Sequence, residues 1–422
     1  TLRVADTDGW LTNALADVSG HLLKKQVVLH LGIRGLLEQD YQQILTGEIA
    51  DFGFAAGAYT IRVKDALFTT KQRIRLGLTT LQAPLNAGVV TNMQVATGVY
   101  FFDAEDWSHV GYVKIDDEII RYEDDSASTA AIFLLDTLTR GVLGGGADAN
   151  HAINAVVQEV LHIGNTLADG AMDALRMLLV SGAGLEASDV YDIDVEVTWT
   201  DATTRAARGR GAGMSPADVA LQDIADLVTA DASLNNTIDL FITEDVEDIK
   251  DLCEREILRA VGAFFFTKYD GRLSVARVKA PAAADVVAAL SAREMRITSW
   301  ELTQDDIVNL INIEYNWSPG TEEFSGQYIA TDATSVSRYG VRKREYSLRA
   351  IQNSTDAGEL TTNILARFKI PYVTVEAVCS LAELYLDVGD VVRLTNFNLP
   401  NLSTGYRGVY EQLWQCVGKR VD

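Results

Sequence analysis

The stretch "RGVLGGGADANHAINAVVQEV", residues 140–160, joins two segments rich in β-branched residues through a loop of three glycines, an aspartate and a histidine. Such a loop can be a phosphate cradle, a catalytic site or a structural connection. A phosphate-binding loop carries Lys and then Ser or Thr directly after its glycines, at the start of a helix. Here Asn150 and His151 lead into a strand-like run instead, which argues against a nucleotide site.

The second possibility is a catalytic pair, with His151 as a general base and Asp148 as the carboxylate that orients it. No GxSxG nucleophile turn accompanies them. The other four histidines stand alone in the sequence: His21, His30, His109 and His162. We therefore predict that His151 is structural and marks the start of the next strand, and that Gly144–Gly146 allow a backbone path that side chains would obstruct. The loop should lie at the edge of a β-domain and line no pocket.

The segments before this loop have the pattern of β-structure. Residues 24–68 contain short β-branched runs separated by Gly and Asp, with alternation in Tyr59, Ile61 and Val63 and a turn at Gly57, as in an antiparallel meander. Residues 111–125, "GYVKIDDEIIRYEDD", predict two strands about a tight acidic turn.

The middle of the chain has helical periodicity. Residues 169–184 place four apolar side chains on one face and stop at Gly182: Met172, Leu175, Leu178 and Leu179. Residues 214–230 predict a helix with Ser215 as N-cap, Pro216 at the first position and four residues inward: Leu221, Ile224, Leu227 and Val228. A third helix is expected over 244–262, and Asp270-Gly271 predicts a hairpin after it.

The last third returns to β-structure around one helix. Strands are expected in residues 309–317, 372–397 and 410–422. Residues 358–370 predict a helix that ends before Pro371 and turns four side chains inward: Leu360, Ile364, Leu365 and Phe368.

Composition narrows the possible partners. The 422 residues carry 59 acids and 36 basic residues, a formal net charge of −23, so most of the surface would repel DNA phosphates.

Cys253, Cys379 and Cys416 have neither zinc-ligand nor disulfide-framework spacing and are expected to be core thiols. No apolar run is long enough for a membrane span and the start lacks a signal peptide, so a soluble, unexported chain is expected, with an N-terminus that is processed or incomplete.

Clusters of acidic and of basic residues are candidates for cation, catalytic or partner sites. Asp6–Gly9 and residues 116–125 lack the calcium-loop spacing, and turn chemistry explains the first. A glycosidase needs two catalytic carboxylates that face each other, and the sequence does not single out such a pair among 59 acidic residues. Gly209 to Gly213 are expected to form a flexible stretch that carries Arg210, with Arg205 and Arg208 just before it. The densest basic cluster either meets an acidic patch on a neighbouring subunit or is a solvated face: Arg338, Arg342, Lys343, Arg344 and Arg349.

Residues 111–123 followed by 135–157 resemble a segment that recurs in bacteriophage tail proteins: an "I-D-x-E-x-I-x-Y" strand pair, a "T-R-G" step, a small-residue loop and an "H-A-x-x-A-x-V" strand. Other stretches are similar, in the same order, to hub proteins of the baseplate or tail tip, including those of gene transfer agents. They are residues 44–67, 252–278, 306–316 and 386–395. Together they cover about half of the chain.

The resemblance implies an α+β, mainly β fold: two β-barrel-like domains flank an α/β middle domain, with an inserted β-hairpin module. The expected limits are 1–100 for the first β-barrel-like domain, 101–165 for the inserted module, 166–290 for the middle domain and 291–422 for the second β-barrel-like domain, which contains one helix.

The resemblance also implies a role. The chain would be a non-enzymatic virion protein without a cofactor or metal, at the tail tip or baseplate of a virion assembled in the host cytoplasm. A homotrimeric ring would join the tail tube and the distal tail protein to the central fibre or tip, and DNA would pass its lumen unbound. Some relatives hold an iron–sulfur cluster on four clustered cysteines, which this chain lacks. Two alternatives stay open: a distal-tail or other baseplate protein, and a carbohydrate- or peptidoglycan-cleaving tail enzyme.

Overall fold

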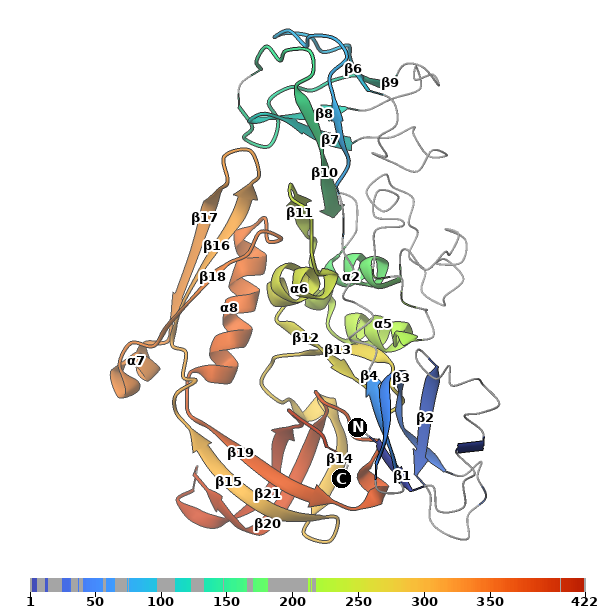
Figure 1. The fold of residues 1–422 in the computed structure, drawn as a ribbon. Helices are drawn as coiled ribbons and strands as arrows, with labels where there is room; N and C mark the ends of the chain where they lie inside the picture. The colour runs from blue at the N-terminus through green and yellow to red at the C-terminus, as the bar shows by residue number, and fades with distance from the viewer. Residues whose placement is uncertain are drawn as a thin grey trace.

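A computed structural model shows an elongated arrangement of several small sheets around a helical middle (Figure 1). The residues that it describes are 2–5, 12–13, 25–31, 37, 41–55, 58–64, 74, 76–96, 111–122, 133–146, 148–164, 170–180, 212, 214, 218–402 and 404–420. Several residues named in the predictions lie outside these ranges: His21, His109, Gly57, Asp6–Gly9 and the arginines of residues 205–210.

The N-terminal sheet is the expected antiparallel meander. Its spatial order is β1 (Leu2–Ala5), β4 (Ala58–Lys64), β3 (Gln42–Ala55) and β2 (Gln26–Leu31). Along β4, Tyr59, Ile61 and Val63 are half-buried and the residues between them are exposed, because successive side chains of a strand point to opposite faces. His30 is an exposed residue of β2, so it is a strand residue as expected.

The opening stretch belongs to a second β-region, which we call the β-module. Its main sheet has the order β11 (Asp239–Ile242), β10 (Val156–Gly164), β7 (Gly111–Ile115) and β8 (Glu118–Tyr122), and β5 (Leu78–Thr80) also pairs with β10. β6 (Asn92–Val95) and β9 (Phe133–Asp136) form a separate pair. The strand pair about the acidic turn at Asp116 is therefore confirmed. Figure 1 shows the β-module at one end of the molecule.

The β-module has a core of its own, drawn from residues 81–95 and 113–157. Its largest buried side chains include Leu81, Ile115, Ile120, Tyr122 and Leu135. The domain limits expected from the sequence remain a prediction.

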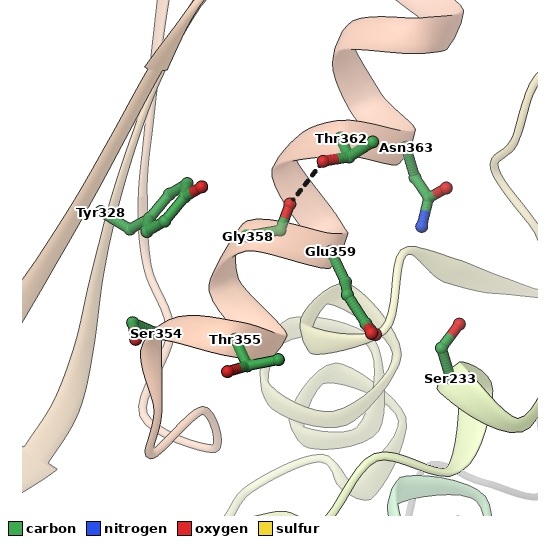
Figure 2. A pocket seen from close by; sticks show the side chains of 8 residues that line it. All are labelled: Ser233, Tyr328, Ser354, Thr355, Gly358, Glu359, Thr362 and Asn363. Carbon is green, nitrogen blue, oxygen red and sulfur yellow. Dashed lines mark hydrogen bonds between the residues drawn. The ribbon is translucent and has the colours of Figure 1, made fainter.

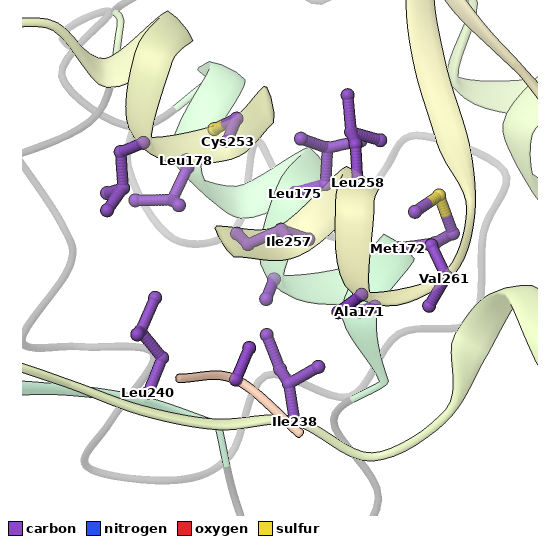
Figure 3. Close-up of a cluster of buried hydrophobic side chains, with 14 of the residues drawn as sticks. Ala171, Met172, Leu175, Leu178, Ile238, Leu240, Cys253, Ile257, Leu258 and Val261 are labelled. Carbon is purple, nitrogen blue, oxygen red and sulfur yellow. The ribbon is translucent and has the colours of Figure 1, made fainter. Parts of the chain in front are cut away.

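The helical middle surrounds the largest apolar core (Figure 3). Its elements are α2 (Ala171–Val180), α5 (Leu221–Ala230), η4 (Ala232–Asn235), α6 (Ile249–Leu252), the π-helical turn η5 (Cys253–Leu258), and the hairpin of β12 (Ala263–Thr267) and β13 (Leu273–Arg277). The apolar face of α2 is confirmed, since Met172, Leu175, Leu178 and Leu179 are all buried. The hairpin at Asp270-Gly271 is also confirmed, and Gly271 has the positive φ of 87° that its turn requires.

Two helix starts predicted from the sequence are wrong. Helix α5 begins at Leu221 with Ala220 as N-cap, instead of at Ser215 and Pro216, which lie outside the described residues. The reason is tertiary: Val219 forms a parallel bridge with Leu273, and Ala220 N–H donates to the Leu273 carbonyl, so these residues pair with β13 instead of continuing the helix. The third helix begins at Ile249, where the Asp248 side chain accepts from Lys250 N–H, so the preceding acids lie before the helix.

Helix α8 (Ser354–Phe368) covers a three-stranded sheet, of order β17 (Glu323–Thr331), β16 (Leu310–Ser318) and β18 (Lys343–Ser347), and α7 (Ala333–Tyr339) precedes β18. The helix and its end before Pro371 are confirmed, with Leu360 and Ile364 buried and Leu365 and Phe368 partly buried against the same core.

The C-terminal strands form two sheets around a third core. One has the order β14 (Val286–Ser291), β20 (Val391–Asn401) and β21 (Tyr406–Gln415), and the other pairs β15 (Met295–Thr303) with β19 (Tyr372–Cys379). The short 3₁₀ turns η6 (Ala283–Asp285) and η7 (Leu381–Glu383) precede β14 and β20.

The mainly β character of the fold is confirmed, but the expectation of barrels is not met within the described residues. There, no backbone ladder links β15 or β19 to β14 or β21, and the first sheet stays open between β1 and β2. The two C-terminal sheets share apolar side chains instead of closing through hydrogen bonds. In the described part of the chain, no helix combines the length and the apolar character needed to cross a membrane.

Candidate functional site

The most highly organised polar group in the β-module is centred on Glu118, the first residue of β8. Its side chain is 1% exposed and forms a two-pronged ion pair with Arg140, which is 3% exposed. Arg140 Nε donates to Oε1 and Arg140 Nη2 donates to Oε2, both at 2.6 Å. This parallel geometry matches a guanidinium to a carboxylate and is among the strongest hydrogen-bonded pairs that proteins form.

Three more donors complete the environment of this carboxylate. The backbone N–H of Gly141 donates to Oε1 at 3.1 Å, and the backbone N–H of Ala149 donates to Oε2 at 3.2 Å. His151 Nε2 lies 2.8 Å from Oε2. An ionised carboxylate only accepts hydrogen bonds, so the imidazole donates here, and both oxygens of Glu118 are fully used.

His151 bridges two carboxylates. Its Nε2 faces Glu118, and its Nδ1 lies 3.0 Å from Oδ2 of Asp116, whose side chain is largely exposed. The ring itself is 2% exposed. The two contacts give the buried histidine a fixed place between β7, β8 and the loop.

Hydrogen bonding outweighs burial in setting the charge state of Glu118. Burial alone would raise the pKa of this carboxyl. The hydrogen bonds from Arg140, His151 and Ala149, with the positive charge of Arg140, more than offset that effect and hold the pKa of Glu118 below its ordinary value. The cluster is therefore built around an ionised carboxylate.

The glycines of the opening stretch allow the loop to approach two other segments closely. Gly144 has a φ of 70°, and a Cβ on Gly145 would lie 2.6 Å from the backbone nitrogen of Ile119. On the other side, the Ser318 hydroxyl and the Gly320 N–H both donate to the Leu143 carbonyl, at 2.7 and 3.1 Å. The predicted role is thus confirmed for Gly144 and Gly145 and is wrong for Gly146, where a Cβ would meet its nearest neighbour at an ordinary 3.4 Å.

This loop also connects the β-module to the C-terminal part of the chain. A Cβ on Gly320, in the turn between β16 and β17, would overlap the backbone of Gly145. The loop therefore docks on that turn of the same chain.

The rejected pair of Asp148 and His151 is absent: the Asp148 carboxylate accepts from Gly88 N–H at 2.6 Å and contacts Arg140 Nη2 at 3.0 Å. The predicted strand start at His151 is wrong. His151 forms an isolated bridge with Leu85, and β10 begins only at Val156. Glu118 and Arg140 both belong to the resemblance motifs, but no local pattern pairs them. The available signal was an acid directly before the apolar pair Ile119-Ile120, because a buried acid needs a buried basic partner.

The enzyme alternative required a histidine in contact with a carboxylate in a pocket. The contact exists, but His151 and Glu118 are buried and their polar atoms are occupied by protein partners. His162 is also engaged: Nε2 contacts Asp239, and the ring stacks on Phe241 with centroids 4.3 Å apart. Both ring nitrogens of His151 are therefore occupied by protein carboxylates.

Figure 2 shows a groove elsewhere in the molecule, between α8, β17 and η4. It encloses about 450 Å³ and is lined by Ser233, Tyr328, Ser354, Thr355, Gly358, Glu359, Thr362 and Asn363. Glu359 is the one carboxylate in that lining, and it accepts from Asn236 Nδ2 at 3.0 Å. A glycosidase needs two facing carboxylates, so this groove lacks the arrangement for that chemistry.

The cysteines are dispersed. Cys253 is buried in the main core, where desolvation raises its pKa, as expected of a core thiol. Cys379 is exposed and Cys416 is half-buried, so the expectation of three core thiols is wrong for these two. Cys379 is the last residue of β19, and Cys416 directly follows β21, where a strand leaves the sheet. In the described ranges, no three His, Cys, Asp or Glu side chains are grouped to hold a metal ion.

The fold and the cluster define a mainly β protein in which the conspicuous motif is architectural. No family model and no curated protein matches the chain. Similar solved structures include a protein of the virion of a native gene transfer agent particle, at 15% identity, 76% coverage of this chain and 77% of that one, and a TM-score of 0.32.

Two prophage proteins are also similar. The tail protein of a Listeria monocytogenes EGD-e prophage has 8% identity, coverage of 82% and 83%, and a TM-score of 0.27. The 43 kDa tail protein of prophage MuSo2 from Shewanella oneidensis has 12% identity, coverage of 84% and 89%, and a TM-score of 0.25. Likenesses this remote carry no argument about function.

Proposed function

We propose that this chain is a structural protein of a phage or phage-like tail, and that it serves as a hub at the baseplate or tail tip. The observation that supports the proposal is that three motifs of the resemblance, which are separate in the sequence, meet in the structure. Glu118 from "I-D-x-E-x-I-x-Y", Arg140 from "T-R-G" and His151 from "H-A-x-x-A-x-V" meet in one buried cluster. Residues from all three sequence motifs of the resemblance therefore belong to one structural unit.

The same cluster supports a non-enzymatic role. A catalytic base must reach the proton that it removes from a substrate, within hydrogen-bonding distance. Both ring nitrogens of His151 instead contact protein carboxylates, and both oxygens of Glu118 accept hydrogen bonds from protein donors. In the proposed role, these groups hold the β-module together without a cofactor or metal.

The charge of the chain suits a tail component. In the proposed hub, three copies form a ring that joins the tail tube and the distal tail protein to the central fibre or tip. A net charge of −23 would let DNA pass through the lumen without adhering. Such a protein would be assembled in the host cytoplasm and reside in the virion.

The first test is the mass of the assembled protein in solution. A particle of three times 46.0 kDa supports the hub, and a sixfold ring supports the distal-tail alternative. The second test is antibody labelling of tails under the electron microscope. Labelling away from the tail tip would contradict the hub, and no labelling of tails would contradict a tail protein altogether.

The enzyme alternative is tested by measuring peptidoglycan and polysaccharide cleavage by the purified chain, its His151→Ala variant and its Asp148→Ala variant. The structural role predicts that the parent has no activity to lose. Activity in the parent that is abolished in either variant would contradict it.

A further inference from the structure

Three exposed aromatic side chains lie on the β20–β21 hairpin. The register pairs Asn396 with Val409, and both are buried, Val409 within the third core. Their neighbours Phe397 and Tyr410 therefore point outward. Tyr406 lies on β21 beyond Gly408, whose φ of 115° interrupts the regular alternation, and it is exposed as well.

A glycine of β21 lies beside the Phe397 ring. Gly408 lies between Tyr406 and Tyr410, and a Cβ there would lie 4.0 Å from Cδ1 of Phe397. The Phe397 ring thus lies beside the position where β21 has no side chain. We call Phe397, Tyr406 and Tyr410 the aromatic face.

This face is unusually exposed. Phe397 is 72%, Tyr406 79% and Tyr410 70% exposed. Single exposed apolar residues are normal, but clustered ones mark interaction sites, and tyrosine is enriched at the centres of protein interfaces. The exposed parts of three aromatic side chains amount to roughly 300–550 Å². That is over a third of the about 800 Å² that each partner contributes to a standard interface.

The charge distribution identifies the partner. Residues 394–410 contain one charged side chain, Arg407, in a chain whose net charge is −23. Two copies of this chain repel one another over most of their surfaces, and a nearly neutral face is where they can meet without that penalty. A basic partner would instead be drawn to the acidic remainder of the surface.

We propose that the aromatic face is a contact surface for a second copy of this chain. The assignment deepens the proposed function, on which it rests for the idea of a ring of copies. Figure 1 shows the β20–β21 hairpin at the end of the molecule opposite the β-module, so this contact leaves the β-module outside the shared surface.

The test compares sedimentation equilibrium of the full chain with that of the triple variant Phe397→Ser, Tyr406→Ser and Tyr410→Ser. A matched control replaces three exposed aliphatic residues elsewhere: Ile329→Ser, Val341→Ser and Val378→Ser. We expect the parent and the control to self-associate, and the triple variant to do so at least ~10-fold more weakly. Far-UV circular dichroism checks that each variant is folded.

A second measurement does not depend on any variant. Chemical modification of Tyr406 and Tyr410 in the parent should fall when the protein is concentrated and rise when it is diluted. A parent that stays monomeric overturns the assignment, as does a triple variant that assembles like the parent. Variant-sensitive binding to neutral glycans or phosphatidylcholine vesicles without self-association also overturns it. Antibody labelling of tails tests the proposed tail function separately, so the tail function and the contact surface can be contradicted independently of each other.

Discussion

At the scale of single residues, Glu118 holds the β-module together because it accepts all the hydrogen bonds that join β8 to Arg140, Gly141, Ala149 and His151. Removing its charge leaves the buried guanidinium of Arg140 with only the partly exposed carboxylate of Asp148 beside it. The Glu118→Gln variant should lose about 3 kcal/mol or more of unfolding free energy, since breaking one side of a buried ion pair costs that much. Urea unfolding, with hydrogen exchange of the β7 and β8 amides, measures it.

The matched control is Glu322→Gln. Its carboxylate is exposed and lies 3.8 Å from Lys114 Nζ, so we expect a loss below about 1 kcal/mol. Equal losses in the two variants would contradict the central place of Glu118.

The pH dependence follows from the same residue. The folded pKa of Glu118 is lowered from its ordinary value of 4.5, so its ionised form stabilises the fold above that pH. This stabilisation should disappear as the pH falls below 4.5 toward the folded pKa. Hydrogen exchange of the β-module measured from neutral to acidic pH tests this, and the Glu118→Gln profile should be flatter. A parent profile as flat as that of the variant would show that Glu118 is not the titrating group.

At the scale of elements, the backbone of the loop over residues 140–151 packs directly against the backbone of β8. Gly145→Ala should destabilise the loop by about 1–3 kcal/mol, because the added methyl group meets the Ile119 backbone, which cannot move without shifting β8. Gly146→Ala is the matched control in the same loop, since its Cβ would meet its nearest neighbour at an ordinary 3.4 Å. Thermal unfolding of both variants tests the difference, and equal melting temperatures would contradict the close approach.

Elements with their own periodicity could be predicted from the sequence. The apolar stripe of α2 and the Asp270-Gly271 turn are local signals, and both correspond to observed elements. The start of α5 could not be predicted, because the capping pattern at Ser215 competes with a bridge between Val219 and Leu273. That bridge joins residues far apart in the chain, and no local pattern reports it.

At the scale of the whole molecule, charge governs association. Because copies of net charge −23 repel one another, self-association should strengthen as salt is added. The Debye length falls from about 30 Å at 0.01 M to about 10 Å at 0.1 M salt, so the change should occur over that range. Sedimentation velocity at low and moderate ionic strength measures it. Association that weakens with salt would indicate attraction between opposite charges, for which the basic residues 338–349 are the available surface.

A mainly β chain with helices in its middle and an architectural glycine-rich loop could be predicted from local features. These features are side-chain periodicity, turn chemistry and the absence of a nucleophile motif. The folded chain was needed to show that Glu118, Arg140 and His151 share one cluster, that Asp148 does not orient the histidine, and that the described sheets stay open. A buried charge is stabilised by whichever partners the packed chain brings near it, and those partners come from separate segments, so no local pattern reports them.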